Sequence, residues 1–244
     1  MLSKNEIKWI TSLKNKKYRH NHLAFLAEGP KLVNDLLLNA LVPIKIYTLD
    51  DTFIDSDRFS DKLVIITPSE LKKISSLKTP HSVLAVFEMK KESLEKLHPD
   101  TKWGFAFENL QDPGNLGTIL RTMDWLGINH IYCSNDSVDV YNPKVVQATM
   151  GAIGRVSVQY VDLNSFLSQQ EVPIYAADMG GEPINKTKLK KGIIVFGNEG
   201  NGLSKTITDR VNQIISIPKY GKGESLNVAM STGIIAAYLT MNEG

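Results

Sequence analysis

Three segments of this 244-residue chain combine glycines with short polar side chains, which suits binding and catalysis. The first segment, Glu108–Gly117, contains Asn109, Asp112 and Asn115, and Arg121 follows it. On a helix, Arg121 would lie about one and a half turns beyond Asn115. An arginine there is either an ordinary solvated residue or a clamp for a phosphate group. The residues alone leave both interpretations open.

The second segment, Gly197-Asn198-Glu199-Gly200-Asn201-Gly202-Leu203, has glycines that let a ligand approach the backbone closely. It lacks the Gly-Lys-Ser/Thr of a phosphate-binding loop and the spacing of a dinucleotide-binding loop. The carboxylate of Glu199 would also repel a phosphate. The segment therefore suits a neutral or cationic ligand, or a structural hydrogen bond from backbone N–H groups to Glu199.

The third segment, residues 217–231, leads from a strand end through a glycine-rich loop to a helix. We expect Glu224 or Ser225 to cap that helix, which would run from Ser225 to Met241. Asn227 would then lie inside the first turn, where asparagine is a poor helix former. We expect its side chain to form a local hydrogen bond instead.

Alternating strands and helices position these segments, as expected for a parallel α/β sheet with helices on both faces. The strands of the second half are predicted at 103–107, 130–133, 156–160, 174–177, 193–196 and 214–217. The helices there are predicted at 116–126, 143–150, 163–170, 203–210 and 225–241. Each of the three segments directly follows a strand, and ligands of such sheets bind where strands end.

The first hundred residues predict a smaller α/β unit. Short β-branched runs indicate strands at 44–49, 63–67 and 83–87, and a helix is predicted at 30–39. A second helix begins after Thr67, because Pro68 and Glu70 complete the pattern of a capping box. The charged stretch 89–101 is predicted to connect the two halves.

Composition narrows the class of protein. Apolar residues make up 42% of the chain and charged residues 22%, which is sufficient for a buried core. Cys133 is the single cysteine, so an internal disulfide and a multi-cysteine zinc site are excluded, and we expect no metal. The sequence shows neither a membrane-spanning run nor a signal-peptide core. We therefore expect a cytoplasmic protein.

The net charge of +2 hides an uneven distribution. The first 22 residues carry six lysines and arginines against Glu6 alone. Lys16, Lys17, Tyr18 and Arg19 combine cations with an aromatic ring, which suits an RNA backbone with an unpaired base. The alternative is a solvated helix with no such role.

The three segments together resemble the ordered motifs of the SpoU/TrmH family of RNA ribose 2′-O-methyltransferases, in the SPOUT superfamily. The resemblance covers about residues 103–242. The first hundred residues are similar, more weakly, to the substrate-binding domain of that family, at Lys16–Arg19 and Phe25–Gly29. The resemblance implies a substrate-binding domain at 1–97 and a methyltransferase domain at 98–244. It also implies a deep trefoil knot at about 193–242.

The resemblance further implies a site that binds S-adenosyl-L-methionine. Its cofactor-binding candidates are Gly197, Asn198, Ile217, Pro218, Gly221 and Leu226. Its catalytic candidates are Arg121, Asn115, Glu199, Ser225 and Asn227. Because a guanidinium holds its proton tightly, we expect Arg121 to clamp phosphate and orient the ribose rather than act as a base.

The expected function is methylation of a ribose 2′-hydroxyl in RNA. Ribosomal RNA is favoured over transfer RNA because of the extra N-terminal domain. The alternatives are transfer RNA as substrate, methylation of a base by the same fold, and a non-catalytic RNA-binding or assembly factor. The family implies a homodimer in which one subunit's arginine meets its neighbour's site. Small residues in the last helix are compatible with that interface and equally with packing inside one subunit.

Overall fold

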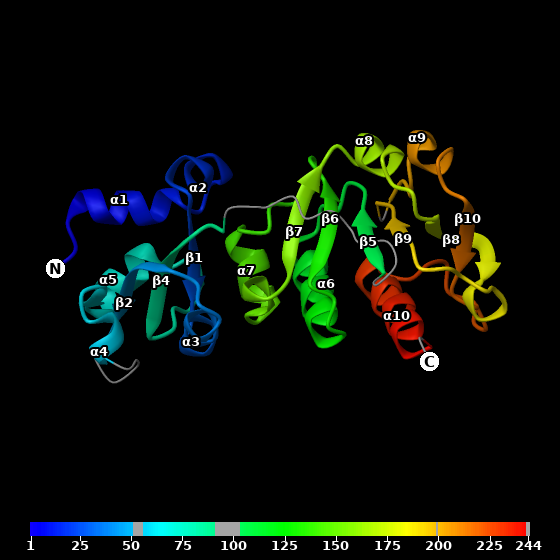
Figure 1. Ribbon diagram of the computed structural model, residues 1–244. Helices are drawn as coiled ribbons and strands as arrows, with labels where there is room; N and C mark the ends of the chain where they lie inside the picture. Colours follow the sequence, from blue (N-terminus) through cyan, green and yellow to red (C-terminus); the bar gives the residue numbers. More distant parts are fainter. Residues whose placement is uncertain (51–55, 91–102, 199, 243–244) are drawn as a thin grey trace. The chain divides into compact units, whose positions relative to one another are not determined.

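The computed structural model describes residues 1–50, 56–90, 103–198 and 200–242. The chain forms two compact units (Figure 1). The first unit comprises Met1–Lys91 and Asp139–Arg155, and the second comprises Glu92–Val138 and Val156–Gly244. The first unit is therefore built from two separate stretches of chain. The domain boundary expected between residues 97 and 98 lies outside the described residues.

The first unit contains a four-stranded sheet of order β1-β4-β2-β3. Its strands are β1 (Ala24–Glu28), β2 (Pro43–Thr48), β3 (Leu63–Ile65) and β4 (Val83–Glu88). Strands β2, β3 and β4 lie where the sequence predicted them. Strand β1, which pairs antiparallel with β4, was not among the predicted strands. All five of its residues are buried, so it lacks the alternation that distinguishes a strand from a buried helix.

Helices pack around this sheet in the first unit. They are α1 (Lys4–Ser12), α2 (Lys16–His22), α3 (Pro30–Leu38), α4 (Ser56–Phe59), α5 (Pro68–Ile74), α7 (Pro143–Thr149) and the 3-10 turn η1 (Ala152–Gly154). The predicted capping box of α5 is confirmed. The backbone N–H of Glu70 donates to Thr67 Oγ1, and the N–H of Thr67 donates to the Glu70 carboxylate at 3.0 Å.

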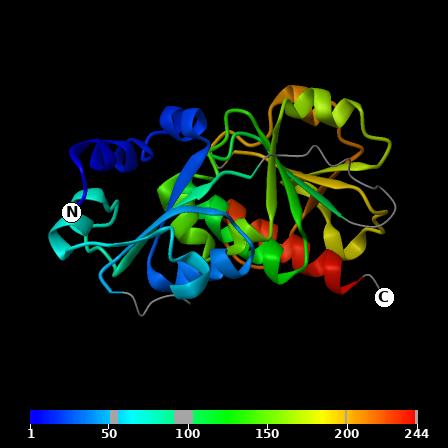
Figure 2. The same ribbon diagram turned by 60° about the vertical axis from the view of Figure 1, so that its left-hand side comes forward.

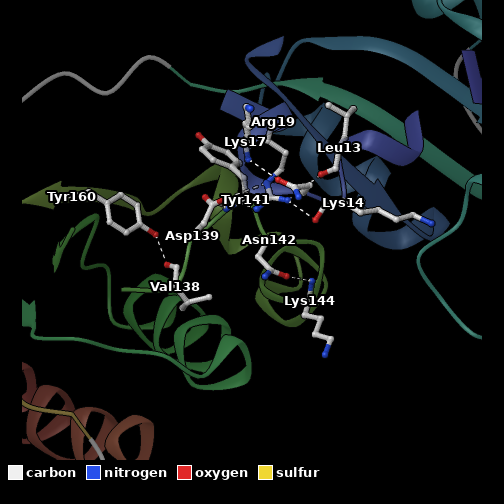
Figure 3. Close-up of polar contacts among 11 residues, drawn as sticks. Leu13, Lys14, Lys17, Arg19, Val138, Asp139, Tyr141, Asn142, Lys144 and Tyr160 are labelled. Atoms are coloured by element: carbon white, nitrogen blue, oxygen red, sulfur yellow. Dashed lines mark hydrogen bonds and ion pairs between the residues drawn. The ribbon is translucent and has the colours of Figure 1, made fainter. Parts of the chain in front are cut away.

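A buried ion pair joins the two stretches of the first unit (Figure 3). Nε and Nη2 of Arg19, on α2, donate to Oδ2 of Asp139 at 3.0 and 2.5 Å. The remaining guanidinium donor, Nη1, reaches the carbonyl oxygens of Leu13 and Lys14 at 3.0 and 2.9 Å. Oδ1 of Asp139 accepts from the backbone N–H of Tyr141. The buried guanidinium and the buried carboxylate are thus both hydrogen-bonded.

Two further contacts hold the C-terminal end of the stretch 139–155. Lys90 Nζ donates to the carbonyl of Gly154 at 2.6 Å, and burial lowers the pKa of Lys90. Arg155 forms an ion pair with Asp35 at 2.8 Å, in which each side chain is about a third exposed. Residues 139–155 are therefore anchored to the first unit at both ends.

The second unit is a six-stranded sheet of order β10-β8-β9-β5-β6-β7, and every neighbouring pair of strands is parallel. The strands are β5 (Gly104–Phe107), β6 (His130–Ser134), β7 (Ser157–Val161), β8 (Ile174–Pro183), β9 (Ile193–Phe196) and β10 (Gln213–Ser216). The parallel α/β architecture predicted from the alternating pattern is confirmed. The trefoil knot stays a prediction.

Helices cover both faces of this sheet. They are α6 (Pro113–Trp125), α8 (Leu163–Ser168), α9 (Lys205–Thr208) and α10 (Val228–Met241), with the 3-10 turn η2 (Ile184–Lys186). Helices α6 and α10 pack together on one side, and α8 and α9 lie on the other (Figures 1 and 2). Among the described residues, no helix combines the length and apolar character needed to cross a membrane.

Candidate functional site

The loop after β5 is held by hydrogen bonds at Asn109. This residue has φ 52°, in the left-handed region that asparagine tolerates better than most residues. Its N–H donates to Ser134 Oγ at 2.7 Å, and its carbonyl accepts from Asn198 Nδ2 at 2.9 Å. Its side-chain oxygen accepts from the Gln111 amide. Hydrogen bonds therefore hold the N–H, the carbonyl and the side chain of Asn109.

Helix α6 begins directly after that loop. Asp112 is its N-cap and accepts from the N–H of Asn115 at 2.8 Å, and Pro113 occupies the first helical position. The helix thus begins three residues earlier than the predicted Leu116, because Asp-Pro is itself a strong helix start. Asn115 consequently lies in the first turn of α6, where its backbone is anchored to the cap.

The loop after β9 folds tightly on itself. Asn198 and Gly202 exchange two backbone hydrogen bonds, at 3.0 and 2.9 Å. Gly197 packs so closely against this bridge that a Cβ there would lie 2.3 Å from the carbonyl carbon of Gly202. Gly202 itself has φ +66°. Gly197 therefore requires glycine, and the backbone of Gly202 favours it. Glu199 lies outside the described residues.

The loop after β10 ends at Asn227, which is the N-cap of α10. Its Oδ1 accepts from the N–H groups of Ala229 and Met230. The expected start at Ser225, with Glu224 or Ser225 as the cap, was wrong. Asparagine is among the best N-cap residues, so the helix begins one residue after it, at Val228. The expected local hydrogen bond of the Asn227 side chain is confirmed.

Asn227 also joins the third loop to the first. Its Nδ2 donates to Oδ1 of Asn115 at 2.9 Å, while its Oδ1 serves the helix N-terminus. The side-chain amide thus bridges α10 and α6, which pack against each other. Two of the catalytic candidates are therefore in direct contact although 112 residues separate them in sequence.

A cavity of about 620 Å³ lies at the ends of β9 and β10 and beside residues 177–179 of β8. Its lining includes all the cofactor-binding candidates and one catalytic candidate: Gly197, Asn198, Ile217, Pro218, Gly221, Leu226 and Ser225. Sequence reasoning missed Ala177, Asp178 and Met179, which also line it. Asp178 and Met179 directly follow the strand predicted at 174–177, so the rule that ligands bind where strands end could have found them; in the structure β8 continues to Pro183. The Asp-Met-Gly-Gly that follows Ala177 resembles the other glycine-containing segments and was the available signal.

Arg121 lies apart from the cavity lining. It is exposed on α6, and its guanidinium forms no hydrogen bond or ion pair with another residue in the described part of the chain. Asn115 and Asn227 are likewise not among the cavity-lining residues. The structure therefore groups the candidates into a cavity, an amide pair beside the α10 N-terminus, and an exposed cation.

The four RNA-binding candidates on α2 do not share one environment. Lys16 and Lys17 are exposed, and Tyr18 is 45% exposed. Arg19 is only 1% exposed, and its guanidinium is bound to Asp139 and to two carbonyls (Figure 3). Its assignment to RNA is therefore corrected: Arg19 packs inside the first unit and presents no charge to a ligand.

Comparison with known proteins agrees with this arrangement. Residues 104–237 match the SpoU rRNA Methylase family, and residues 4–85 match the MRM3-like substrate binding domain. The 23S rRNA (guanosine(2553)-2′-O)-methyltransferase RlmP of Bacillus subtilis is 27% identical over 244 residues, which cover 97% of each chain.

Two solved structures extend the likeness over the whole chain. A Porphyromonas gingivalis protein assigned to the TrmH family of RNA methyltransferases is 34% identical, with TM-score 0.81 and 97% of each chain covered. The AdoMet-bound rRNA methyltransferase of Sinorhizobium meliloti is 26% identical, with TM-score 0.87, covering 100% of this chain and 97% of that one.

The parallel sheet with a cavity at its strand ends, joined to a smaller α/β unit, is the architecture of an RNA methyltransferase with a substrate-binding domain. The chain belongs to the SpoU rRNA Methylase family. The family and the enzyme class expected from the three motifs are thereby confirmed.

Proposed function

We propose that this enzyme transfers the methyl group of S-adenosylmethionine to the 2′-hydroxyl of a ribose in ribosomal RNA. The observation that carries the proposal is the cavity at the ends of β9 and β10, which is lined by every residue at which the motifs place the cofactor. The Bacillus subtilis relative, which the chain matches over nearly its full length, is named for this reaction on 23S rRNA.

The residues of the cavity fit S-adenosylmethionine. Its volume lies within the range of small-molecule sites, about 300–1,000 Å³. Gly197 and Gly221 in the lining carry no side chain, so main-chain groups are available to a ligand there. Asp178, Lys219 and Glu224 add charges of both signs to the lining, which suits a ligand with two cationic groups and a carboxylate. The Sinorhizobium meliloti structure contains AdoMet.

When bound, the cofactor supplies a methyl group on a positively charged sulfur. The ribose 2′-oxygen forms the new C–O bond as the C–S bond breaks, and the hydroxyl proton is released. The protein must hold the hydroxyl in line with the methyl group, because correct orientation contributes much of such a rate enhancement. The role of orienting polar groups of the ribose is assigned in this proposal to the Asn115–Asn227 pair, whose mutual hydrogen bond supports it.

Arg121 is assigned to the RNA backbone. Its exposed guanidinium offers a planar fork of donors and no acceptor, which matches a phosphate and does not suit the role of a base. Arg121→Lys keeps the charge and loses the fork, so we expect kcat to fall at least about tenfold with cofactor affinity unchanged. Near-wild-type turnover would contradict the clamp.

The RNA is captured, in this proposal, by the exposed cations of α2. Lys16→Gln with Lys17→Gln should weaken RNA binding and reduce the slope of log affinity against log salt by roughly 1.4, about 0.7 for each phosphate of a single strand that is no longer neutralised. The matched control is Lys186→Gln with Lys188→Gln, a pair of exposed lysines in the second unit. Equal effects of the two double variants would remove α2 from the binding surface.

We also propose that the enzyme is a homodimer formed through α10 and α6. Trp125 on α6 is 89% exposed, and Met230, Ile234 and Met241 are exposed at helical spacing on α10. These exposed apolar residues lie on two helices that pack together, which supports an interface there. Sedimentation should give a dimer for the wild type and a monomer for Ile234→Glu. A monomeric wild type at micromolar concentration would refute this part.

We propose that the two parts of the chain divide the work between RNA binding and methyl transfer. Residues 1–97 bind substrate and 98–244 carry the chemistry, with 139–155 packed into the substrate-binding unit. The enzyme is proposed to act in the cytoplasm, on the ribosomal RNA found there.

The function is tested by incubating the full chain with methyl-labelled S-adenosylmethionine and unmodified ribosomal RNA. We expect label on a ribose 2′-oxygen at a defined nucleotide, and none with Arg121→Ala. Label on a base would favour base methylation. Cofactor binding by calorimetry without transfer to any ribosomal RNA would refute the proposed substrate.

A further inference from the structure

Asn198 has a role that its place in the cofactor motif does not explain. It lines the cavity, yet within the described residues every hydrogen bond formed by its side chain goes to protein backbone. Oδ1 accepts from the N–H groups of Gly200 and Asn201, at 2.9 and 3.2 Å. Nδ2 donates to the carbonyl of Asn109, at 2.9 Å. One half of the amide thus organises its own loop, and the other half reaches a different loop.

The loop that receives this bond leads into the catalytic candidates. Asn109 precedes the cap of α6 by three residues, and α6 carries Asn115 and Arg121. The left-handed backbone of Asn109 is held by Ser134 on its N–H side and by Asn198 on its carbonyl side. Removing the Asn198 donor would leave that carbonyl without its side-chain partner and release one side of the loop.

A second bond runs in parallel with the first. The N–H of Ser204, the N-cap of α9, donates to the Glu108 carboxylate at 2.7 Å. This bond connects the end of the loop after β9 with the start of the loop after β5. The Glu108 contact fixes the two loops at one point, and the Asn198 contact supplies the second point needed to fix their relative orientation.

We propose that Asn198 is a positioning residue, whose side-chain amide sets the loop that lines the cofactor cavity against the loop that leads to Asn115 and Arg121. The inference rests on the proposed function, because it assigns these two loops to cofactor and ribose respectively. It gives the Asn198 side chain a role through Asn109 and leaves the cofactor contact at this position to the backbone.

The two halves of the amide can be separated by substitution. Asn198→Asp keeps the acceptor for Gly200 and Asn201 but replaces the donor by an oxygen that faces the Asn109 carbonyl. Asn198→Ala removes both halves. The matched control is Asn129→Asp, which adds the same charge at an exposed position. Asn129 directly precedes β6, at the end of the sheet where the strands begin, whereas the two loops lie where the strands end.

Three measurements on the full chain distinguish the roles. For Asn198→Asp we expect the Kd for S-adenosylmethionine by calorimetry to stay within about twofold, and kcat on RNA to fall roughly tenfold to a hundredfold. For Asn198→Ala we expect the Kd for S-adenosylmethionine to rise and kcat on RNA to fall. Hydrogen exchange should speed up in a peptide spanning residues 108–112 of Asn198→Asp, with residues 200–202 still protected. Asn129→Asp should match the wild type in all three.

Two results would overturn the inference. One is an Asn198→Asp variant whose Kd rises tenfold or more while kcat is unchanged, which would give the side chain a direct contact with the cofactor. The other is unchanged exchange at residues 108–112. Because the exchange measurement needs no RNA, it decides the inference even if the wild type methylates no ribosomal RNA, a result that would refute only the proposed function.

Discussion

Replacing Asp139 by asparagine tests how much the buried ion pair stabilises the first unit. The side-chain amide in Asp139→Asn would keep an oxygen for the N–H of Tyr141, so the change replaces the Oδ2 acceptor beside Arg19 with an NH2 group and removes the negative charge. The two side chains are 2% and 5% exposed, so water cannot replace the missing partner. The guanidinium would remain charged in the interior.

The expected loss of stability follows from that burial. Breaking a buried pair by removing one partner costs about 3–5 kcal/mol. Arg19 keeps the carbonyls of Leu13 and Lys14 as acceptors, so we expect the lower end, about 3 kcal/mol. A loss of this size changes the opening equilibrium by roughly a hundredfold. Added salt should change it little, because a buried pair is poorly screened.

Native-state hydrogen exchange measures this loss unit by unit, which avoids assuming a single unfolding step. Amides of β1 and β4 should lose about 3 kcal/mol of protection, and amides of β5 and β9 should change little. The control is Asp35→Asn, because Asp35–Arg155 connects the same two stretches of chain but is about a third exposed. Its cost should stay below about 1 kcal/mol. A cost below about 1 kcal/mol for Asp139→Asn as well would refute the assignment of Arg19 as a structural residue.

Two further predictions concern the cavity and acid stability. Gly197→Ala places a Cβ 2.3 Å from the carbonyl carbon of Gly202. Calorimetry should therefore show at least about tenfold weaker cofactor binding. Unchanged affinity would contradict the packing described for this loop. Hydrogen bonds from the N–H groups of Thr67 and Leu2 lower the pKa of Glu70 from 4.5 to about 2. Glu70 therefore contributes stability above pH 4.5 that is lost as the pH falls toward 2. Glu70→Gln should flatten the fall of the urea-unfolding midpoint across this window, and a slope equal to that of the wild type would exclude the contribution.

The parallel sheet and the loops of the site could be predicted from sequence because their signals are local. Buried β-branched runs give the strands, and the residues after β5, β9 and β10 combine turn formers with polar groups. The capping box at Thr67 was predictable because both of its partners lie within four residues. Asp178 was not singled out, although it directly follows the strand predicted at 174–177.

Long-range partners could not be predicted in this way. Arg19 and Lys17 look alike in sequence, and only the position of Asp139, 120 residues away, makes one of them buried and leaves the other exposed. The side chain of Asn198 could not be assigned for the same reason, since its partner Asn109 is 89 residues away. Pattern and spacing identify the chemical type of a residue, whereas the fold decides which of its atoms remain available.

The two-stretch construction of the first unit has a consequence for its synthesis. Arg19 leaves the ribosome 120 residues before Asp139, which corresponds to a delay of about 6–24 s at typical rates of translation. During that interval β5 and β6 of the second unit are made, while the first sheet still lacks α7 and the carboxylate that neutralises its interior arginine. The unit nearest the N-terminus is therefore completed only after synthesis of the catalytic half has begun. A ribosome stalled before residue 139 would hold a nascent chain whose first unit is not yet closed.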